Sequence, residues 1–312
     1  MAPRTRAAKA REAAAACLLL DLSHDEVSIV THELCDPLQP LLAVHLSITA
    51  KGLREAMEVQ LAELKQQWQQ AKALALLSRS GQGATSCANL RDAKLLLLGA
   101  RRCRPLALTH WRTLGTLARC RSLPALQQIE IIDDGSGDAG VELLAAGLRR
   151  GSLPSLWRLV LWRAQIGPQG ASALATALTE RAVPSLKELD LDDNHLGGAG
   201  LAALAPALRQ LPALESLFLR FNQITDQGLA SLLALATAGV LMSLQSLNLY
   251  DNQITDEGCA ALASALGGGA LPALEQLELE DNPASKQARR AACEVLDARQ
   301  LLNDDEDEDE VW

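Results

Sequence analysis

The sequence predicts an α/β solenoid, in which strand–helix units stack into a right-handed arc around one parallel inner sheet. The 312-residue chain is 48% hydrophobic but only 3% aromatic, which favours a thin aliphatic layer repeated many times over a single globular core. From Leu126 onward the sequence also repeats itself about every 28 to 30 residues. A period of this length is typical of stacked supersecondary units that share one continuous core.

Each copy opens with Leu-x-x-Leu-x-Leu-x-x-Asn or a close variant, and the pattern is complete from Leu186 to Asn194 and from Leu244 to Asn252. The alternating leucines indicate a short strand with one buried face. An apolar residue, a glycine and an Ala/Leu-rich stretch with helical spacing follow, so each unit is a strand, a turn, a helix and a loop. The copies begin at Leu126, Leu156, Leu186, Leu214, Leu244 and Leu274.

The repeat predicts the positions of six strands and of the side chain that ends each strand. Asparagine ends most strands, where its amide can bond backbone groups of the turn, but Asp134 and Ala164 replace it in the first two copies. The strand cores are expected near 127–132, 157–162, 187–192, 215–220, 245–250 and 275–280.

In period and in its helical second half, the segment 126–302 resembles the ribonuclease-inhibitor class of leucine-rich repeats. The resemblance implies a horseshoe with strands on the concave side and helices outside. Residues 93–125 end like the later copies, yet their strand lacks the alternation, so we interpret them as a degenerate repeat or an N-terminal cap.

The N-terminal third differs from the repeats in its residue composition and pattern. Residues 1–21 are rich in Ala and Arg and form a helix, a tail or a targeting segment. Residues 22–80 are expected to be helical, and 22–54 resemble an F-box, which implies docking to a Skp-type adaptor. A helical cap with the same leucine spacing is the alternative. The F-box resemblance rests on Leu22, Asp25, Val27, Val30 and Leu34.

Charge and cysteine usage exclude several classes. Seven consecutive carboxylates, Asp304 to Glu310, supply most of the net charge of −9, so we expect a disordered acidic tail over 303–312 and no basic face for nucleic acid. The seven scattered cysteines favour reduced thiols in the cytoplasm or nucleus. No apolar run predicts a membrane span. We expect a monomer without a metal, cofactor or catalytic site.

The aromatic residues suggest where a partner binds. Five of the eight fall at outward positions of the predicted strands, with arginines between them, and such residues dominate protein interfaces. We therefore expect a non-enzymatic module that holds a protein on its concave face, and an Asp192–Arg220 ion pair that places the guanidinium between the rings of Trp162 and Tyr250. The candidate binding residues are Trp157, Arg158, Trp162, Arg163, Asp192, Phe218, Arg220, Phe221 and Tyr250.

A second function class is a GTPase regulator. The repeat class and the acidic C-terminal stretch resemble Ran GTPase-activating protein, although the present chain has fewer repeats and a shorter acidic region. An activator needs an arginine that reaches the nucleotide. Arg163, beside the end of a predicted strand, is the candidate.

Overall fold

The computed structural model describes Gln66 and residues 93–309, except 99–107, 121–122, 133–134 and 149–150. The segments predicted over 1–21 and 22–80, including the F-box-like stretch 22–54, therefore lie outside the described residues apart from Gln66.

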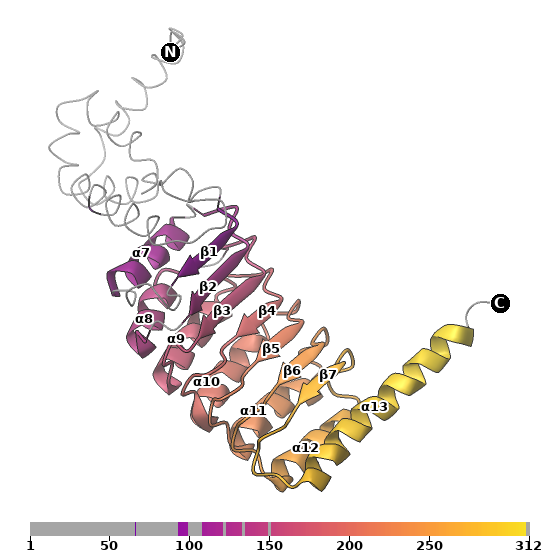
Figure 1. Cartoon of the computed structure of the whole chain (residues 1–312). Helices are drawn as coiled ribbons and strands as arrows, with labels where there is room; N and C mark the ends of the chain where they lie inside the picture. Colours follow the sequence, from indigo (N-terminus) through magenta and orange to yellow (C-terminus); the bar gives the residue numbers. More distant parts are fainter. Residues whose placement is uncertain are drawn as a thin grey trace, which may run out of the picture.

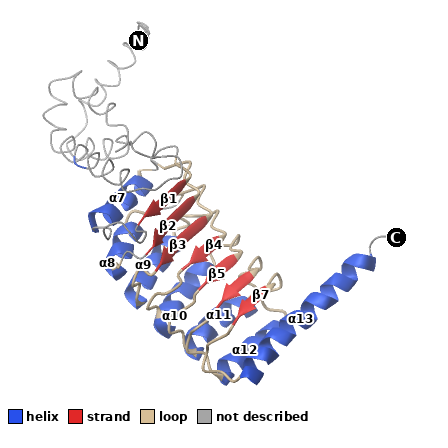
Figure 2. Ribbon diagram, in the orientation of Figure 1, coloured by secondary structure: helices blue, strands red, loops and turns tan. Residues whose placement is uncertain are grey.

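The described part of the chain forms one sheet of seven parallel strands, which lie side by side in sequence order. A layer of helices covers one side of this sheet (Figures 1 and 2). The strands are β1 (Leu95–Leu98), β2 (Gln128–Ile132), β3 (Arg158–Trp162), β4 (Glu188–Asp190), β5 (Ser216–Phe218), β6 (Ser246–Asn248) and β7 (Gln276–Glu278). The helices are α7 (Leu108–Arg119), α8 (Gly137–Ala145), α9 (Pro168–Thr179), α10 (Gly197–Leu208), α11 (Asp226–Thr237), α12 (Asp256–Gly267) and α13 (Lys286–Asp309).

All six strands predicted from the repeat are present, in the predicted places. The last four, β4 to β7, have three residues each and are shorter than expected, because the chain turns toward the closing asparagine soon after the strand's central leucine. Residues 93–125 contribute a strand of their own, β1, which pairs in register with β2. Its four leucines alternate between half-buried and buried, an alternation that the uniform sequence conceals.

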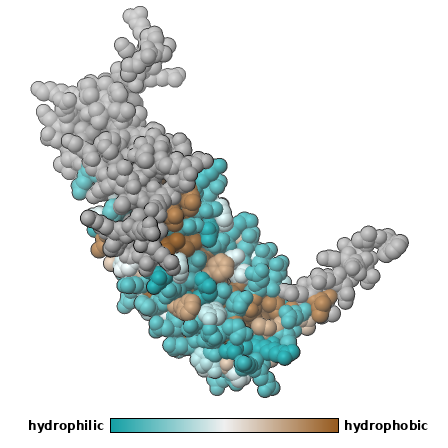
Figure 3. Space-filling model, in the orientation of Figure 1, coloured by the Kyte–Doolittle hydropathy of each residue, from teal (hydrophilic) through white to brown (hydrophobic). Residues whose placement is uncertain are grey.

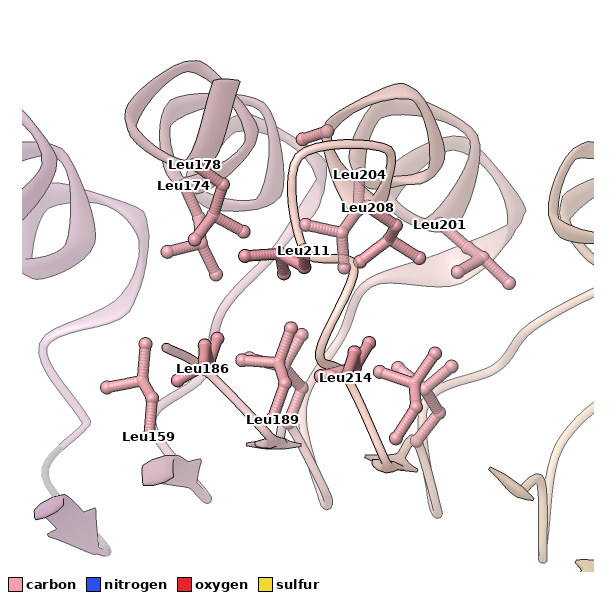
Figure 4. Packing of buried hydrophobic residues seen from close by; sticks show 14 of the residues in the cluster. Leu159, Leu174, Leu178, Leu186, Leu189, Leu201, Leu204, Leu208, Leu211 and Leu214 are labelled. Carbon is pink, nitrogen blue, oxygen red and sulfur yellow. The ribbon is translucent and has the colours of Figure 1, made fainter. Parts of the chain in front are cut away.

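The core is a continuous layer of leucines between the sheet and the helices. Leucines from the strands face leucines from the helices, as Figure 4 shows for Leu159 and Leu189 below and Leu174, Leu178 and Leu204 above. Each repeat therefore supplies only one slice of the core and depends on its neighbours to enclose it. The leucines expected to be buried are all fully buried: Leu189, Leu191, Leu217, Leu219, Leu247 and Leu249.

The closing asparagines link successive repeats. Asn252 is buried. Its Nδ2 donates to the carbonyl oxygens of Leu219 (2.9 Å) and Leu249 (3.0 Å). Its Oδ1 accepts from the backbone N–H groups of Asn222 (3.1 Å) and Ile224 (2.9 Å). One amide thus bonds its own turn and the turn of the preceding repeat, which confirms and extends the expected role. Asn194, Asn222 and Asn282 are buried in the same way.

Glycine allows two neighbouring helices to approach closely. A Cβ at Gly228 in α11 would lie 2.7 Å from the Cα of Gly198 in α10, a distance shorter than real Cβ contacts. The glycine that recurs near the start of each helix is therefore explained here by helix spacing rather than by a bound ligand.

The C-terminus differs from the sequence-based expectation. Instead of a disordered tail, α13 continues through the acidic run to Asp309 and projects beyond the last repeat (Figure 1). Arg299 anchors this helix, because its guanidinium donates to the carbonyl oxygens of Ala270 (2.9 Å) and Leu271 (2.6 Å). Burial lowers the pKa of Arg299. Among the described helices, none combines the length and the apolarity that crossing a membrane requires.

We expect Leu219→Ala to lower the free energy of unfolding by ~2–5 kcal/mol, because it leaves a cavity in the shared leucine layer. Urea unfolding of the two proteins measures the loss. The control is Met242→Ala, since Met242 is 54% exposed and should lose little. Equal stabilities for Leu219→Ala and the wild type would show that the core assignment is wrong.

Candidate functional site

The strands expose a second set of side chains on the side of the sheet away from the helices. We call this surface the concave face, and its side chains form three rows across the strands. The first row is Gln128, Arg158, Glu188, Ser216, Ser246 and Gln276; the second is Glu130, Val160, Asp190, Phe218, Asn248 and Glu278. The third, two residues further along each strand, is Ile132, Trp162, Asp192, Arg220, Tyr250 and Glu280.

The structure places most of the predicted binding residues on this face. Arg158 lies in the first row, Phe218 in the second, and Trp162, Asp192, Arg220 and Tyr250 in the third. Trp157 precedes β3, at the opposite end of that strand from Trp162. Arg163 and Phe221 follow the third row in turns where both residues have a positive φ, of 54° and 53°. The carboxyl ends of β3 to β6 thus carry most of the candidate residues.

The expected pair between Asp192 and Arg220 is confirmed. Arg220 Nε lies 2.7 Å from Asp192 Oδ2, and the backbone N–H of Arg220 donates to Asp192 Oδ1 at 2.6 Å. Asp192 is only 3% exposed although it belongs to the concave face. Burial raises the pKa of Asp192, and the hydrogen bonds from Arg220 oppose that rise without cancelling it. This carboxylate therefore serves to fix the third row across two repeats.

The ring of Tyr250 makes a contact that the sequence did not predict, while the expected position of the Arg220 guanidinium between the rings of Trp162 and Tyr250 stays a prediction. Among the described residues, Tyr250 makes its ring contact with Phe221, edge to face, with centroids 5.4 Å apart and an interplanar angle of 66°. The Tyr250 hydroxyl donates to the carboxylate of Asp281, which raises the pKa of Tyr250. The sequence pattern missed this contact because Phe221 lies beyond the strand, in a turn where its φ is positive, so strand alternation does not predict its neighbours.

The other arginines of the candidate site are also paired. Arg158 joins three strands, with Nη1 2.6 Å from Glu130 and Nε 2.7 Å from Glu188. Arg163 Nε lies 3.0 Å from Asp193 Oδ2. A GTPase-activating role for Arg163 would require this pair to break.

Asp190 is a feature that the sequence analysis did not single out. It is half-buried in the second row, where Val160 and Phe218 occupy the paired positions on the neighbouring strands. Burial raises the pKa of Asp190 from its ordinary value of 3.8 to about 6, and the Asp192 carboxylate adds to the rise. Among the described residues, Asp190 has no ion-pair partner; its Oδ1 accepts a hydrogen bond of 2.9 Å from the backbone N–H of Asp192.

The equivalent position two repeats later holds a neutral side chain with the same contact. Asn248 Oδ1 accepts a hydrogen bond of 3.0 Å from the backbone N–H of Tyr250. The backbone contact is therefore made without a charge, and Val160 and Phe218 at the equivalent positions of two other repeats show that the fold requires neither the acceptor nor the charge there. Comparing the fifth residue of each repeat would have revealed Asp190 from the sequence.

The charge of the concave face is unevenly compensated. Its two cations in the three rows, Arg158 and Arg220, are each bonded to carboxylates, whereas Asp190 and Glu278 are acidic without an ion pair among the described residues. The molecular surface in view is mainly hydrophilic with separate apolar patches (Figure 3). Within the described ranges, no group of three or more His, Cys, Asp or Glu side chains is placed to hold a metal ion.

The stacked strand–helix units with their leucine layer and asparagine links define a leucine-rich-repeat solenoid. Consistent with this, residues 184–205, 210–233 and 240–263 match the family model described as Leucine Rich repeat. No match was found among curated proteins.

The solved structures to which the chain is similar include a plant peptide hormone receptor, RGFR1, in complex with RGF2. It is 15% identical, with a TM-score of 0.33, and the match covers 65% of the present chain and 35% of the receptor. A second is the TLR13–ssRNA13 complex, at 19% identity and a TM-score of 0.27, covering 68% and 36% of the two chains. The present chain thus spans about a third of the length of the solved proteins it matches.

We expect Asp190→Asn to raise the free energy of unfolding at pH 8 by about 1–3 kcal/mol. The folded-state pKa of Asp190 is raised, so its ionised form is disfavoured by folding, and this cost develops as the pH rises from the unfolded value of 3.8 through about 6. Asparagine keeps the acceptor and removes the charge. Urea unfolding at pH 8 and pH 4 should show the gain at pH 8 and little difference at pH 4.

The converse change, Asn248→Asp, is the matched control and should lower stability more at pH 8 than at pH 4. A loss of stability for Asp190→Asn at pH 8 would contradict our account of the carboxylate.

Proposed function

We propose that this chain is a non-enzymatic protein-binding module that holds its partner on the concave face. One observation carries the proposal. Trp162, Phe218 and Tyr250 lie at outward positions of three different strands, where they are not needed for the leucine layer. Aromatic side chains on a solvated sheet face lower the cost of burying that face against another protein.

The ion pairs of the concave face support the same proposal. Asp192 with Arg220, and Arg158 with Glu130 and Glu188, each cross between strands at distances of 2.6–2.7 Å. Partly exposed pairs of this kind contribute little to stability. They do hold long side chains in one conformation, so a partner loses less conformational entropy when it packs against them.

We further propose that the chain is a substrate receptor of a ubiquitin ligase, with the F-box-like residues 22–54 bound to a Skp-type adaptor. These residues lie outside the described part of the chain, so this proposal rests on their sequence pattern. Co-expression of the full chain with a Skp-type adaptor tests it. The adaptor should copurify with the wild type and not with a variant in which Leu22, Val27 and Leu34 are replaced by alanine.

The double variant Trp162→Ala/Tyr250→Ala should lose partner affinity by roughly 2 kcal/mol or more, because central aromatic residues account for much of the free energy of interfaces. Partners can be identified by affinity capture with mass spectrometry, and the affinity of each captured protein then measured by calorimetry. Thermal stability should change little, since neither substitution touches a buried leucine.

The control for that experiment is Met242→Ala, which changes an exposed apolar residue beside α11 and α12. It should leave binding intact. Unchanged affinity in the Trp162→Ala/Tyr250→Ala variant would place the interface elsewhere, and collapse of the fold would show that the two aromatic residues are structural.

A further inference from the structure

The middle of the concave face carries a carboxylate between two apolar neighbours. In the second row, Asp190 is paired across the sheet with Val160 on β3 and Phe218 on β5. Adjacent strands lie ~4.8 Å apart, so the two apolar side chains flank the carboxylate at close range. Val160 is only 4% exposed although it belongs to the concave face. Water therefore solvates this carboxylate from a restricted direction, the open side of the sheet.

The structure explains the oxygen of Asp190 but not its charge. Its hydrogen bond to the backbone N–H of Asp192 is made equally well by the amide of Asn248 to Tyr250. The carboxylates of Glu188 on the same strand and of Asp192 just beyond it oppose the negative charge, and Arg220 offsets part of it. The nearby arginines are committed to other partners: Arg220 is bonded to Asp192, and Arg158 to Glu130 and Glu188. A charge that the fold does not need and only partly offsets, without an ion pair among the described residues, is available to a ligand.

On the basis of the proposed concave-face function, we propose that the partner is a protein segment that places an arginine guanidinium on Asp190, against the ring of Phe218. Guanidinium is planar, bonds a carboxylate through two parallel N–H groups and stacks on aromatic faces, so it fits a carboxylate beside a ring better than an ammonium does. The uncompensated carboxylates of this face select a cation and repel phosphate groups, which favours a basic protein segment over nucleic acid.

Binding of such a cation is coupled to the ionisation of Asp190. The charged groups that face it are Glu188 on β4, Asp192 just beyond β4, Arg158 on β3 and Arg220 just beyond β5. Because the pKa of Asp190 in the free protein is about 6, an arginine ligand must meet a carboxylate that is mostly protonated at pH 5 and mostly ionised at pH 7. Affinity should therefore rise about tenfold between these pH values.

The test uses the intact chain and a random peptide library. Peptides are selected on the wild type at pH 7, and those that the Trp162→Ala/Tyr250→Ala variant no longer binds are kept as concave-face ligands. We expect these peptides to share an arginine, and replacing it with citrulline, its neutral analogue, should weaken binding about tenfold or more. Asp190→Asn should cause a similar loss and abolish the pH dependence between pH 5 and pH 7.

A double-mutant cycle separates a direct pair from a general effect of charge. If the guanidinium meets Asp190, Asp190→Asn and the citrulline substitution together should cost little more than either alone. Glu278→Gln is the matched control, because it removes a carboxylate from the same row and should change affinity much less. Additive losses in the cycle would overturn the proposed pairing.

Two outcomes distinguish this inference from the proposed function. Concave-face peptides that lack arginine, or that bind Asp190→Asn as well as the wild type, would overturn the arginine site while leaving the concave face as the binding surface. If every selected peptide binds the Trp162→Ala/Tyr250→Ala variant as well as the wild type, both would be contradicted. Failure to select any peptide would overturn the inference that the ligand is a linear basic segment.

Discussion

The structure depends on one constraint: no repeat can satisfy its own turn or enclose its own leucines. The turn after each strand leaves backbone N–H and C=O groups inside the molecule, and the amide of the closing asparagine of the next repeat bonds them. Asn282, for example, accepts from the N–H of Ile254 and donates to the carbonyl of Leu249, both in the preceding repeat. Because such groups are costly to bury unpaired, the asparagines hold the spacing and order of the repeats as firmly as the leucine layer does.

Because leucines form the core and asparagines bond the turns, only the other side chains remain available for function. The leucines point toward the helices and the asparagines are buried in the turns, so stability requires little of the alternating positions that face away from the helices. Those positions hold tryptophan, phenylalanine, tyrosine, arginine and aspartate in different repeats, while the buried positions stay almost uniform. Variation among otherwise equivalent repeats therefore identifies the positions that the fold leaves unconstrained.

The sequence was sufficient to predict the architecture because the pattern repeats six times, and each copy constrains the others. It predicted the places of six strands and the buried leucines, since period-2 alternation determines which residues face the core. The alternation in β1 was invisible because all four of its residues are leucine. The helical continuation of α13 through the acidic run was missed as well, because composition alone favours disorder in such a segment. In the site, the Asp192–Arg220 pair followed from adjacency of rows, whereas the Phe221–Tyr250 contact depends on a turn with positive φ at Phe221, which no side-chain pattern encodes.

The raised pKa of Asp190 is a consequence, on the concave face, of the way in which the repeats are held together. In a compact domain, a poorly solvated charge can be relieved by shifting a neighbouring element, but here the strands on both sides are held in register by leucines and asparagines. We therefore expect Asp190 to stay between Val160 and Phe218, where burial raises its pKa and where the hydrogen bond from Asp192 and the charge of Arg220 offset only part of that rise. Asn248 shows that the same backbone bond is possible without a charge. A rigid solenoid can keep one such carboxylate because its stability is distributed over many interfaces between repeats, and a cationic partner would recover the lost free energy on binding. The rigidity that holds Asp190 in an unfavourable environment is thus the same property that would preorganise it for a ligand.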